Sequence, residues 1–417
     1  MNPSNIALDS EIGRLRTVIV HTPGPEIENM TPAAAAEALY DDILNLDHAH
    51  REHTQLTGVL KKTARVLELE ELLAEVLRVE GVRREVAESM CRLYQCAELM
   101  EELVALPGDV LAARLIQGTP MVKDTLSKFL SPHRFSLPPL PNAFFTRDAT
   151  MCVHDRVIIG SMAKRARAAE GLVLRTIFRH HPNLAGGGFY FDGTVPGDED
   201  VTIEGGDLLV LREDLVAIGY SERTSAEGID ALIRRMAANG RALEAIVVEL
   251  PKTRATIHLD MVFTMIDRDL CVAFPPLVTG PSKCRAFRLS CRDGKVADIR
   301  EYPGLLEAIG DAGLELTPIA CGGADPLRQE REQWNSGANF LTFAPGQIIG
   351  YGHNPATLAE LAANGFEIVP ADDVIEEKAS LTEGARIAVT IDGPELARGG
   401  GGCRCMTRPV RRDAVEW

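Results

Sequence analysis

The hydrophobic and polar positions of the first 130 residues predict one buried strand followed by helices. Residues 14–20, RLRTVIV, form a short apolar run that ends at a His-Thr-Pro-Gly-Pro turn, which indicates a buried strand. A helical stretch then begins, with Thr31 as the N-cap and Pro32 at the first helical position. From about residue 67 to residue 130 the apolar positions recur with helical spacing. Breaks between these helices are expected at Gly81, Pro107-Gly108 and Gly118-Thr119-Pro120.

Beyond the proline-rich segment 130–142, the pattern changes to short strands that alternate with helices. Strands are predicted at 151–160, 207–219, 245–251, 270–274 and 347–352, and helices that end at a glycine at 224–240 and 354–365. Several stretches share a rhythm of strand, hairpin, helix and strand, but no sequence repeat is strong enough to define a period. The pattern predicts an α/β or α+β fold with mixed sheets and a helical bundle inserted between strands.

The composition excludes several classes of partner. Of the 417 residues, 45% are hydrophobic and 25% are charged, and the formal net charge is −16. No basic stripe is present to neutralise phosphates, so we expect no nucleic-acid partner. No segment reaches the roughly 18 apolar residues of a membrane span, so we expect no membrane partner. Nine scattered cysteines and an N-terminus without an apolar signal region predict a reduced, cytoplasmic protein.

The candidate chemistry lies in four polar clusters that follow the helical stretch. Their sequences are PNAFFTRD at 141–148, IEGGD at 203–207, IHLD at 257–260 and GGGGCRCM at 399–406. Four consecutive glycines are useful only where the chain bends sharply or lies very close to another group. A cysteine that follows them beside Arg404 is expected to be an exposed thiol with a lowered pKa.

Together these clusters hold the groups needed for nucleophilic attack on a planar cation. On a strand, His258 and Asp260 would project from the same face, because strand side chains alternate with a period of two. Glu204 precedes two glycines, where backbone can approach closely, and Asp148 follows an arginine in a turn-rich loop. Carboxylates bind a guanidinium through paired hydrogen bonds, and the thiolate of Cys405 could attack its central carbon. Each cluster alone is more often an ordinary turn or polar pair, so the inference rests on their combination.

In this order, the four clusters resemble the pattern of the arginine deiminases, in the superfamily of guanidine-modifying enzymes. The resemblance spans nearly the whole chain, since SEIGRL at 10–15, LYDD at 39–42 and REQW at 331–334 also match.

This resemblance implies a fold and an assembly. The implied fold is an α/β, five-bladed, pseudo-symmetric propeller of ββαβ units, with an inserted helical domain. Residues 1–66 and 131–417 would form the catalytic propeller, and residues 67–130 the inserted helical bundle. The family also implies a homo-oligomer.

The resemblance further implies a reaction: hydrolytic deimination of free L-arginine to L-citrulline and ammonia through a covalent thiouronium. Cys405 would be the nucleophile, and His258 would protonate the departing ammonia and then activate water. Asp148 and Asp260 would hold the guanidinium nitrogens, while Glu204 would support His258. No metal or organic cofactor is implied. The implied substrate-binding residues are Asn142, Phe145 and Leu39 along the pocket, with Arg167 and Arg223 at the substrate carboxylate.

Two departures from the family pattern bear on specificity. Gly400 stands where many members have a second carboxylate-facing arginine, which leaves room for a modified arginine or another guanidino compound. Arg404 could replace that contact in part, although neighbouring strand residues usually point apart. Residues 335–339, NSGAN, replace a more acidic stretch and are expected to form a loop near the pocket mouth.

Several alternatives stay open at this level. An amidinotransferase would use the same residues but pass the amidino group to an amine, and a guanidino-ligand sensor would bind without turnover. Cys403 competes with Cys405 as the nucleophile, although the family pattern around RCM favours Cys405. His48, His50 and His53 resemble a metal cluster, but a solvated helix surface is the preferred interpretation because no pair is spaced i, i+4.

Overall fold

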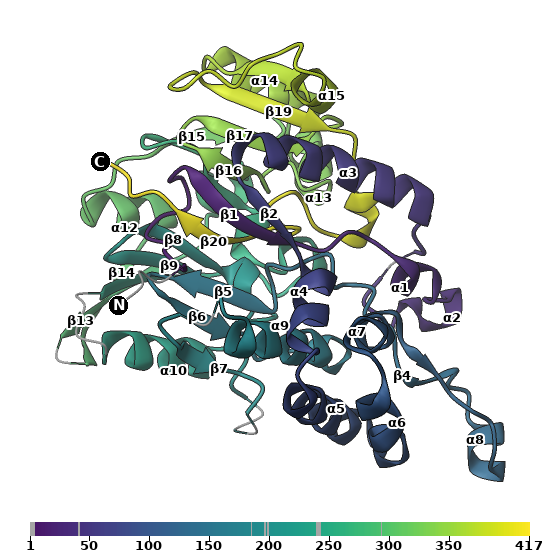
Figure 1. Ribbon diagram of the computed structural model, residues 1–417. Helices are drawn as coiled ribbons and strands as arrows, with labels where there is room; N and C mark the ends of the chain where they lie inside the picture. Colours follow the sequence, from purple (N-terminus) through teal and green to yellow (C-terminus); the bar gives the residue numbers. More distant parts are fainter. Residues whose placement is uncertain are drawn as a thin grey trace.

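The computed structural model describes residues 5–40, 42–184, 186–195, 197, 200–238, 243–292 and 294–417. Its strands form mixed sheets with both parallel and antiparallel pairs, and helices pack around them (Figure 1). The fold is therefore α/β with mixed sheets, as the sequence predicts.

Four stretches of the chain repeat one order: an antiparallel hairpin, a helix, and a strand that runs parallel to the second hairpin strand. The first comprises β5 (Thr150–Val153), β6 (Arg156–Ile159), α9 (Ala168–His180) and β7 (Phe189–Asp192). The second comprises β8 (Leu208–Arg212), β9 (Leu215–Tyr220), α10 (Ala226–Ala237) and β10 (Leu243–Glu249), and the hairpin β13 (Ala286–Arg292) and β14 (Lys295–Tyr302) extends its sheet. The third comprises β11 (Phe263–Met265), β12 (Leu270–Ala273), α11 (Pro275–Val278), α12 (Leu305–Asp311) and β15 (Thr317–Ala320). The fourth comprises β16 (Leu341–Ala344), β17 (Gln347–Tyr351), α14 (Pro355–Ala363), β18 (Glu367–Pro370), α15 (Ala371–Ile375) and β19 (Ile387–Ile391), and α13 (Pro326–Trp334) precedes it.

A fifth sheet joins the two ends of the described chain. Strand β20 (Arg408–Arg412) pairs antiparallel with β1 (Leu15–Val20), and β2 (Arg65–Glu68) pairs parallel with β1. The yellow strand β20 therefore lies beside the purple strand β1 in Figure 1. Helices α1 (Pro25–Glu28), α2 (Pro32–Ala35) and α3 (Leu46–Thr63) lie between β1 and β2 in the chain. The segment 399–406, which contains Cys405 and is called the cysteine loop below, directly precedes β20. The pairing of β20 with β1 therefore fixes the cysteine loop against the N-terminal strand.

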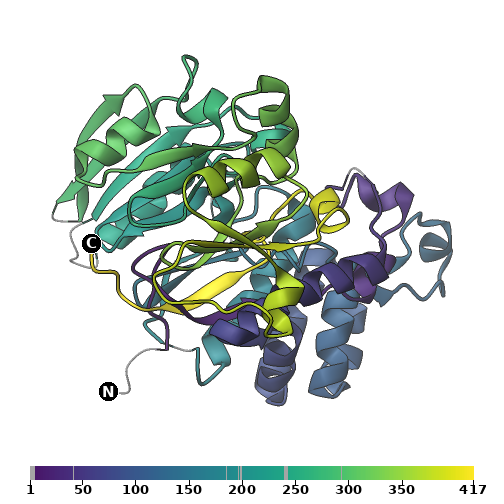
Figure 2. The same cartoon turned by 90° about the horizontal axis from the view of Figure 1, so that it is seen from above.

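The helical stretch between the fifth and first sheets forms, with the expected breaks at Pro107-Gly108 and Gly118-Thr119-Pro120. The break expected at Gly81 is wrong, because Gly81 lies in the first turn of a helix that begins at Glu80. The stretch contains α4 (Leu69–Val76), α5 (Glu80–Tyr94), α6 (Met100–Ala105) and α7 (Gly108–Gln117), followed by β3 (Thr119–Pro120), α8 (Leu126–Leu130) and β4 (Phe135–Leu137). Gly118 ends α7 with a φ of +92°, a conformation that favours glycine. Figures 1 and 2 show these helices gathered on one side of the sheets. Their apolar faces share one core cluster with α9, so they are not packed independently of the sheets.

The predicted strands lie where the structure has strands, but two of them are each a pair of strands joined by a turn. The predicted strand 151–160 is the β5–β6 hairpin, with His154 at its turn in a left-handed conformation (φ +54°). The predicted strand 207–219 is likewise the β8–β9 hairpin. Both hairpins are almost wholly buried, which removes the polar alternation that would reveal a turn in the sequence. Among the described residues, no helix is both long and apolar enough to cross a membrane.

The histidine-rich stretch of α3 departs from its predicted role. His48 and His50 are exposed, as expected for a solvated helix face. His53, in contrast, is fully buried, and burial lowers its pKa to about 4, so it is neutral in the folded protein. The prediction of a solvated surface is therefore wrong for His53, because α3 packs its apolar face inward and this position lies on it.

Candidate active site

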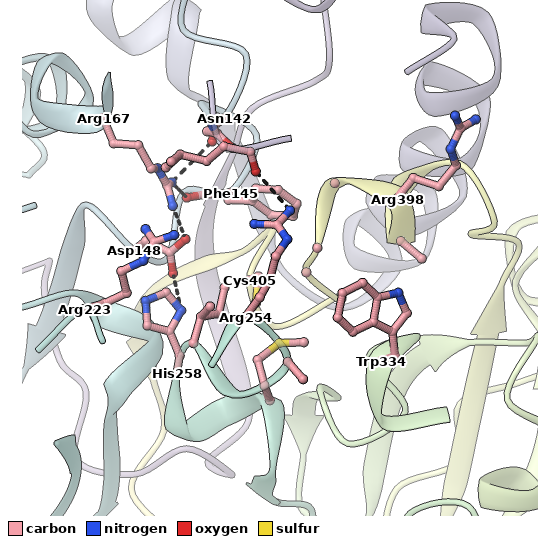
Figure 3. A pocket seen from close by; sticks show the side chains of 18 of the residues that line it. Asn142, Phe145, Asp148, Arg167, Arg223, Arg254, His258, Trp334, Arg398 and Cys405 are labelled. Atoms are coloured by element: carbon pink, nitrogen blue, oxygen red, sulfur yellow. Dashed lines mark hydrogen bonds and ion pairs between the residues drawn. The ribbon is translucent and has the colours of Figure 1, made fainter. Parts of the chain in front are cut away.

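A cavity of about 170 Å³ brings together the ends of several sheets (Figure 3). Its walls come from the loop before β5, the chain after β6, β9 and β10, the end of α13 and the glycine loop after β19. The lining includes eight of the ten predicted site residues: Leu39, Asn142, Phe145, Asp148, Arg167, Arg223, His258 and Cys405. The remaining two, Glu204 and Asp260, are fully buried behind the lining and contact it through hydrogen bonds.

His258 lies between two carboxylates. Its Nε2 is 2.9 Å from Oε2 of Glu204, and its Nδ1 is 3.6 Å from Oδ1 of Asp148. Burial opposes a charge on the ring, but Asp148 and Glu204, together with Asp207, outweigh it and raise the pKa of His258 to about 9. His258 is therefore an imidazolium at neutral pH.

Gly206, the second glycine after Glu204, allows this approach. A Cβ on Gly206 would lie 2.4 Å from Nδ1 of His258, so any larger residue would displace the ring. His258 and Asp260 were expected on a strand, but His258 caps the short 3₁₀ helix η5 (Leu259–Met261), which contains Asp260. The predicted strand is wrong, and the two side chains reach one site through this turn instead.

Cys405 is buried, which contradicts the expectation of an exposed, acidic thiol. Its Sγ lies 3.7 Å from Oδ2 of Asp260, and only 3% of the residue is exposed. Burial, followed by the charges of Asp260 and Asp148, raises the pKa of Cys405 well above its usual value. The neighbouring Arg404 lowers it only slightly, because its guanidinium is bound by two carboxylates. Cys405 is therefore a neutral thiol before a substrate binds.

Arg404 does not reach the pocket. Its guanidinium donates to Oδ2 of Asp260 at 2.6 Å and to both carboxylate oxygens of Glu11 at 3.1 Å. It thus holds Asp260 in place and cannot replace a carboxylate contact from position 400. Cys403, the competing nucleophile, is fully buried in the core and is absent from the cavity lining.

Asn339 holds the cysteine loop against the carboxylate. Its Oδ1 accepts hydrogen bonds from the backbone N–H of Arg404 at 3.1 Å and of Cys405 at 3.2 Å. Its Nδ2 donates to the carbonyl of Asp260 at 3.0 Å. The sequence indicated only a loop at 335–339, and Asn339 is buried beneath the pocket and not at its mouth. A buried asparagine close to the nucleophile carries no motif that would reveal this role.

The two arginines predicted to meet the substrate carboxylate are held by protein carboxylates. Arg167 Nη1 donates to Oδ2 of Asp148 at 2.6 Å, and its Nε and Nη2 donate to Glu170. Arg223 Nη1 lies 3.5 Å from Oε2 of Glu204. Both arginines line the cavity, and both are at most 4% exposed. Glu170, which no motif pointed to, therefore holds Arg167 in its orientation.

At the active site, two buried carboxylate oxygens have no hydrogen-bond donor among the described residues. They are Oδ1 of Asp148 and Oδ1 of Asp260, one from each of the carboxylates next to the cysteine and the histidine. Buried carboxylate oxygens are normally hydrogen-bonded, whereas Oδ1 of Asp148 has only the ion-pair contact with Nδ1 of His258 at 3.6 Å. A planar cation with several N–H groups would satisfy both, so the site is complementary to a guanidinium beside the Cys405 thiol.

Several solved structures share this fold. A dimethylarginine dimethylaminohydrolase adduct with S-methyl-L-thiocitrulline aligns with 94% of this chain and 99% of its own, at a TM-score of 0.50 and 16% identity. The amidinotransferase SxtG from Microseira wollei aligns with 99% of this chain and 98% of its own, at a TM-score of 0.53 and 12% identity. The N-terminal domain of ArgZ, covalently bound to a reaction intermediate, aligns with 96% of this chain and 99% of its own, at a TM-score of 0.53 and 13% identity. These similarities define the α/β fold class.

Sequence comparisons define the family. The arginine deiminase family model matches residues 37–412. The arginine deiminase of Rhodococcus erythropolis (strain PR4 / NBRC 100887) is 36% identical over 427 residues, which cover 98% of each chain. That of Bacillus cereus (strain B4264) is 34% identical over 432 residues, which cover 98% of this chain and 99% of the relative. This chain belongs to the arginine deiminase family.

Proposed function

We propose that this protein hydrolyses free L-arginine to L-citrulline and ammonia through a covalent thiouronium on Cys405. One observation carries the proposal. The Cys405 thiol, the His258–Glu204 pair and two carboxylates with unpartnered buried oxygens surround one cavity in a chain of the arginine deiminase family. The alternatives of an amidinotransferase and a sensor have no observation in their favour.

Substrate binding and activation of the thiol are coupled through charge. Two carboxylates, Asp260 and Asp148, contribute to the raised pKa of Cys405 before a substrate binds. A guanidinium bound between them offsets their charges and adds a positive charge beside the sulfur, so it lowers the pKa of Cys405. The thiolate therefore forms where the electrophilic carbon already lies.

The first half of the reaction replaces a nitrogen by sulfur. The Cys405 sulfur bonds to the guanidinium carbon, and one carbon–nitrogen bond breaks. The thiol proton and the proton of the His258 imidazolium pass to the departing nitrogen, which leaves as ammonium, so that His258 ends neutral. Asp148 and Asp260 hold the remaining nitrogens of the positively charged thiouronium.

The second half regenerates the thiol. Neutral His258 takes a proton from water, whose oxygen bonds to the thiouronium carbon, and the carbon–sulfur bond then breaks. The other water proton returns to sulfur, the product is citrulline, and His258 is again an imidazolium. Glu204, with its pKa lowered and its oxygen 2.9 Å from His258, stabilises that imidazolium in both halves.

The proposal is tested by incubating the protein with L-arginine without an added amine and assaying citrulline and ammonia together. Equal amounts of both products, lost in Cys405→Ala, support it. Product that appears only with an acceptor amine such as glycine or ornithine identifies an amidinotransferase, and binding without product identifies a sensor.

We also propose the finer arrangement of the fold. Of the six sheets in the described residues, the five with three or more strands each contain an antiparallel pair and a parallel strand, and the pairing of β1 with β20 joins the chain ends. This arrangement supports a five-bladed pseudo-symmetric propeller of residues 1–66 and 131–417. The four helices α4–α7, between β2 and β3, support residues 67–130 as its insertion.

Assembly and location complete the proposal. Exposed apolar side chains around α8 support a homo-oligomer, since water-exposed clusters of this kind often mark contacts between subunits; they are Val122, Leu126, Phe129 and Leu130. Light scattering on the purified protein tests the oligomeric state.

All nine cysteines are unpaired, and the mechanism requires a free thiol at Cys405, which supports a reducing, cytoplasmic compartment.

A further inference from the structure

Asp207 ends the IEGGD cluster, and the reaction chemistry described above does not use it. It is the last residue of the short 3₁₀ helix η3 (Gly205–Asp207), and it is fully buried. Asp207 does not occur among the described residues that line the active-site cavity. A buried carboxylate is costly unless hydrogen bonds compensate it, so the partners of Asp207 indicate its role.

One carboxylate oxygen of Asp207 holds the turn that carries His258. Oδ1 accepts a hydrogen bond from the backbone N–H of Leu259, the residue after His258, at 2.9 Å. Gly219, in β9, makes room for this oxygen, since a Cβ on Gly219 would lie 2.2 Å from Oδ1. Any larger residue at position 219 would displace the carboxylate. Asp207 therefore fixes the backbone beside the imidazole from outside the cavity.

The other carboxylate oxygen holds the turn that carries Arg223. Oδ2 of Asp207 accepts a hydrogen bond from the Ser221 hydroxyl at 2.6 Å. Oγ of Ser221 in turn accepts hydrogen bonds from the backbone N–H of Arg223 at 2.9 Å and of Thr224 at 3.2 Å. A hydroxyl has one donor and two acceptor sites, so all the sites of Ser221 are used and its proton points to Asp207. The group at position 207 must therefore be an acceptor on this side as well.

The two turns meet again at Glu204, which closes a ring of contacts. Oε2 of Glu204 is 2.9 Å from Nε2 of His258 and 3.5 Å from Nη1 of Arg223. The backbone N–H of Glu204 donates to Oγ1 of Thr224 at 3.2 Å, and the N–H of Asp207 donates to the carbonyl of Glu204 at 3.1 Å. Figure 3 shows Arg223 and His258 next to each other on one side of the cavity. One buried network thus places the imidazole and the guanidinium.

The charge of Asp207 also acts on His258. Burial lowers the pKa of His258, and the carboxylates that face it, Asp207 included, raise it by more, to about 9. Burial raises the pKa of Asp207 to about 7, so Asp207 is ionised near pH 9, where His258 loses its proton. The titratable and charged side chains around His258 and its carboxylate partners are Asp148, Arg167, Glu204, Asp207, Arg223 and Cys405.

We propose that Asp207 is a positioning residue that holds His258 and Arg223 in one arrangement for the reaction. The inference rests on the proposed function, because it concerns the same active site. Asp207 acts through the backbone of Leu259 and the hydroxyl of Ser221 and not through contact with the substrate. A purely structural carboxylate would affect folding alone, whereas Asp207 should also control the proton transfers by His258.

Asp207→Asn separates these two roles. The amide has nearly the same shape as the carboxylate, but it accepts hydrogen bonds only at its oxygen. It therefore loses the bond to either Leu259 or Ser221, together with the charge. We expect kcat for arginine to fall about 10- to 100-fold and the alkaline limb of kcat/KM to move down by about one pH unit. Steady-state kinetics as a function of pH measure both effects.

Ser221→Ala tests the second half of the network. It removes the acceptor for the backbone N–H of Arg223, but it keeps the Asp207 charge and the bond from Leu259. We expect kcat/KM for arginine to fall about 3- to 30-fold, because Arg223 is less well placed, and the alkaline limb to stay within about 0.3 pH units. An unchanged kcat/KM in Ser221→Ala would contradict the proposal even if Asp207→Asn does not fold.

The matched control is Asp214→Asn. Asp214 lies in the turn of the same β8–β9 hairpin, pairs with Arg212, and has 44% of its side chain exposed. This variant should keep kcat within about threefold and the alkaline limb within about 0.3 pH units of the wild type. If Asp207→Asn melts at a lower temperature but keeps the wild-type kcat and alkaline limb, the proposal is overturned in favour of a structural role.

Failure of the proposed function is distinguishable from failure of this inference. If the wild-type protein forms no citrulline, the function is wrong, and the pKa of His258 is then measured by NMR on protein with ¹³C-labelled histidine, with His258→Asn to assign the signal. A pKa of His258 that is lower by about one pH unit in Asp207→Asn would still support control of His258 by Asp207. An unchanged pKa would contradict it.

Discussion

The sulfur of Cys405 lies 3.7 Å from Oδ2 of Asp260 in a fully buried environment. The same oxygen accepts a hydrogen bond from Arg404 at 2.6 Å, whereas Oδ1 has no donor among the described residues. The Asp260 carboxylate therefore has two opposing effects: it raises the pKa of Cys405, which disfavours the thiolate, and it attracts a cation that favours the thiolate again.

Asp260→Asn separates these two effects. Loss of the charge should lower the pKa of Cys405, so alkylation of this thiol by iodoacetamide at pH 7 should become about tenfold faster or more. At the same time kcat/KM for arginine should fall by about 10- to 100-fold, because a guanidinium contact is lost. Mass mapping of the Cys405 peptide measures the alkylation, and Cys405→Ala in the same background corrects for the other thiols. Slower alkylation in Asp260→Asn would contradict this account.

The pH dependence of turnover should have an alkaline limb set by His258. The reaction needs the imidazolium to supply a proton to the leaving nitrogen, and the pKa of His258 is raised to about 9. We expect kcat/KM to decline about tenfold per pH unit above that value. Glu204→Gln removes an anion that raises the pKa, so the limb should move to lower pH. A limb that stays in place or moves to higher pH in this variant would contradict the assignment.

Asn339 should control the rate more than the binding of substrate. Asn339→Ala removes the acceptor for the backbone N–H of Cys405 and the donor to the Asp260 carbonyl. The nucleophile would then be less well placed, and we expect kcat to fall about 10- to 100-fold with KM changed less than about threefold. Steady-state kinetics and a thermal melt check this together. A large rise in KM at unchanged kcat would show that Asn339 acts on binding instead.

A buried charge cluster outside the active site should make stability fall at alkaline pH. His21 lies 3.1 Å from Glu26 and 3.3 Å from Glu68; burial opposes its charge, but the two carboxylates raise its pKa to about 10. Because the folded pKa exceeds the unfolded value, this stabilisation is complete below about pH 6.5 and is lost as the pH rises toward 10.

Urea unfolding of His21→Gln tests this linkage. At pH 6.5 the variant should be less stable than the wild type by about 3–5 kcal/mol, because buried Glu26 loses its partner. The difference should shrink as the pH approaches 10. The matched control is the exposed His50→Gln, which should stay within about 0.5 kcal/mol of the wild type. A difference that does not depend on pH would contradict the charged state of His21.

The sequence predicted the secondary-structure elements well where the information is local. Apolar runs placed β1 and the hairpins β5–β6 and β8–β9, and the family motifs named eight residues that line one cavity. The expectation of a lowered pKa for the Cys405 thiol was wrong, because this pKa depends on burial and on carboxylates from distant segments. Arg404 is next to Cys405 in the chain, but its guanidinium forms ion pairs with Glu11 and Asp260.

The residues that the sequence did not reveal act through tertiary contacts. Asn339 is one asparagine in an unremarkable turn, and only the fold brings it beneath Cys405. Asp207 ends the IEGGD cluster, but its hydrogen bond from the backbone N–H of Leu259 joins positions 52 apart in the chain. These contacts have no spacing that a sequence pattern could record. Glu170 differs, because its contact with Arg167 is local, three residues apart at the start of α9.

Covalent chemistry on Cys405 is the central claim, and its most direct test is to trap the intermediate. His258→Asn protein, which should hydrolyse the thiouronium slowly, is mixed with excess L-arginine, quenched in acid and digested for peptide mass spectrometry. We predict an adduct on Cys405 whose mass equals that of arginine minus ammonia. Cys403 should be unmodified, and Cys405→Ala should form no adduct. An adduct on Cys403, or citrulline formed by Cys405→Ala, would contradict the account.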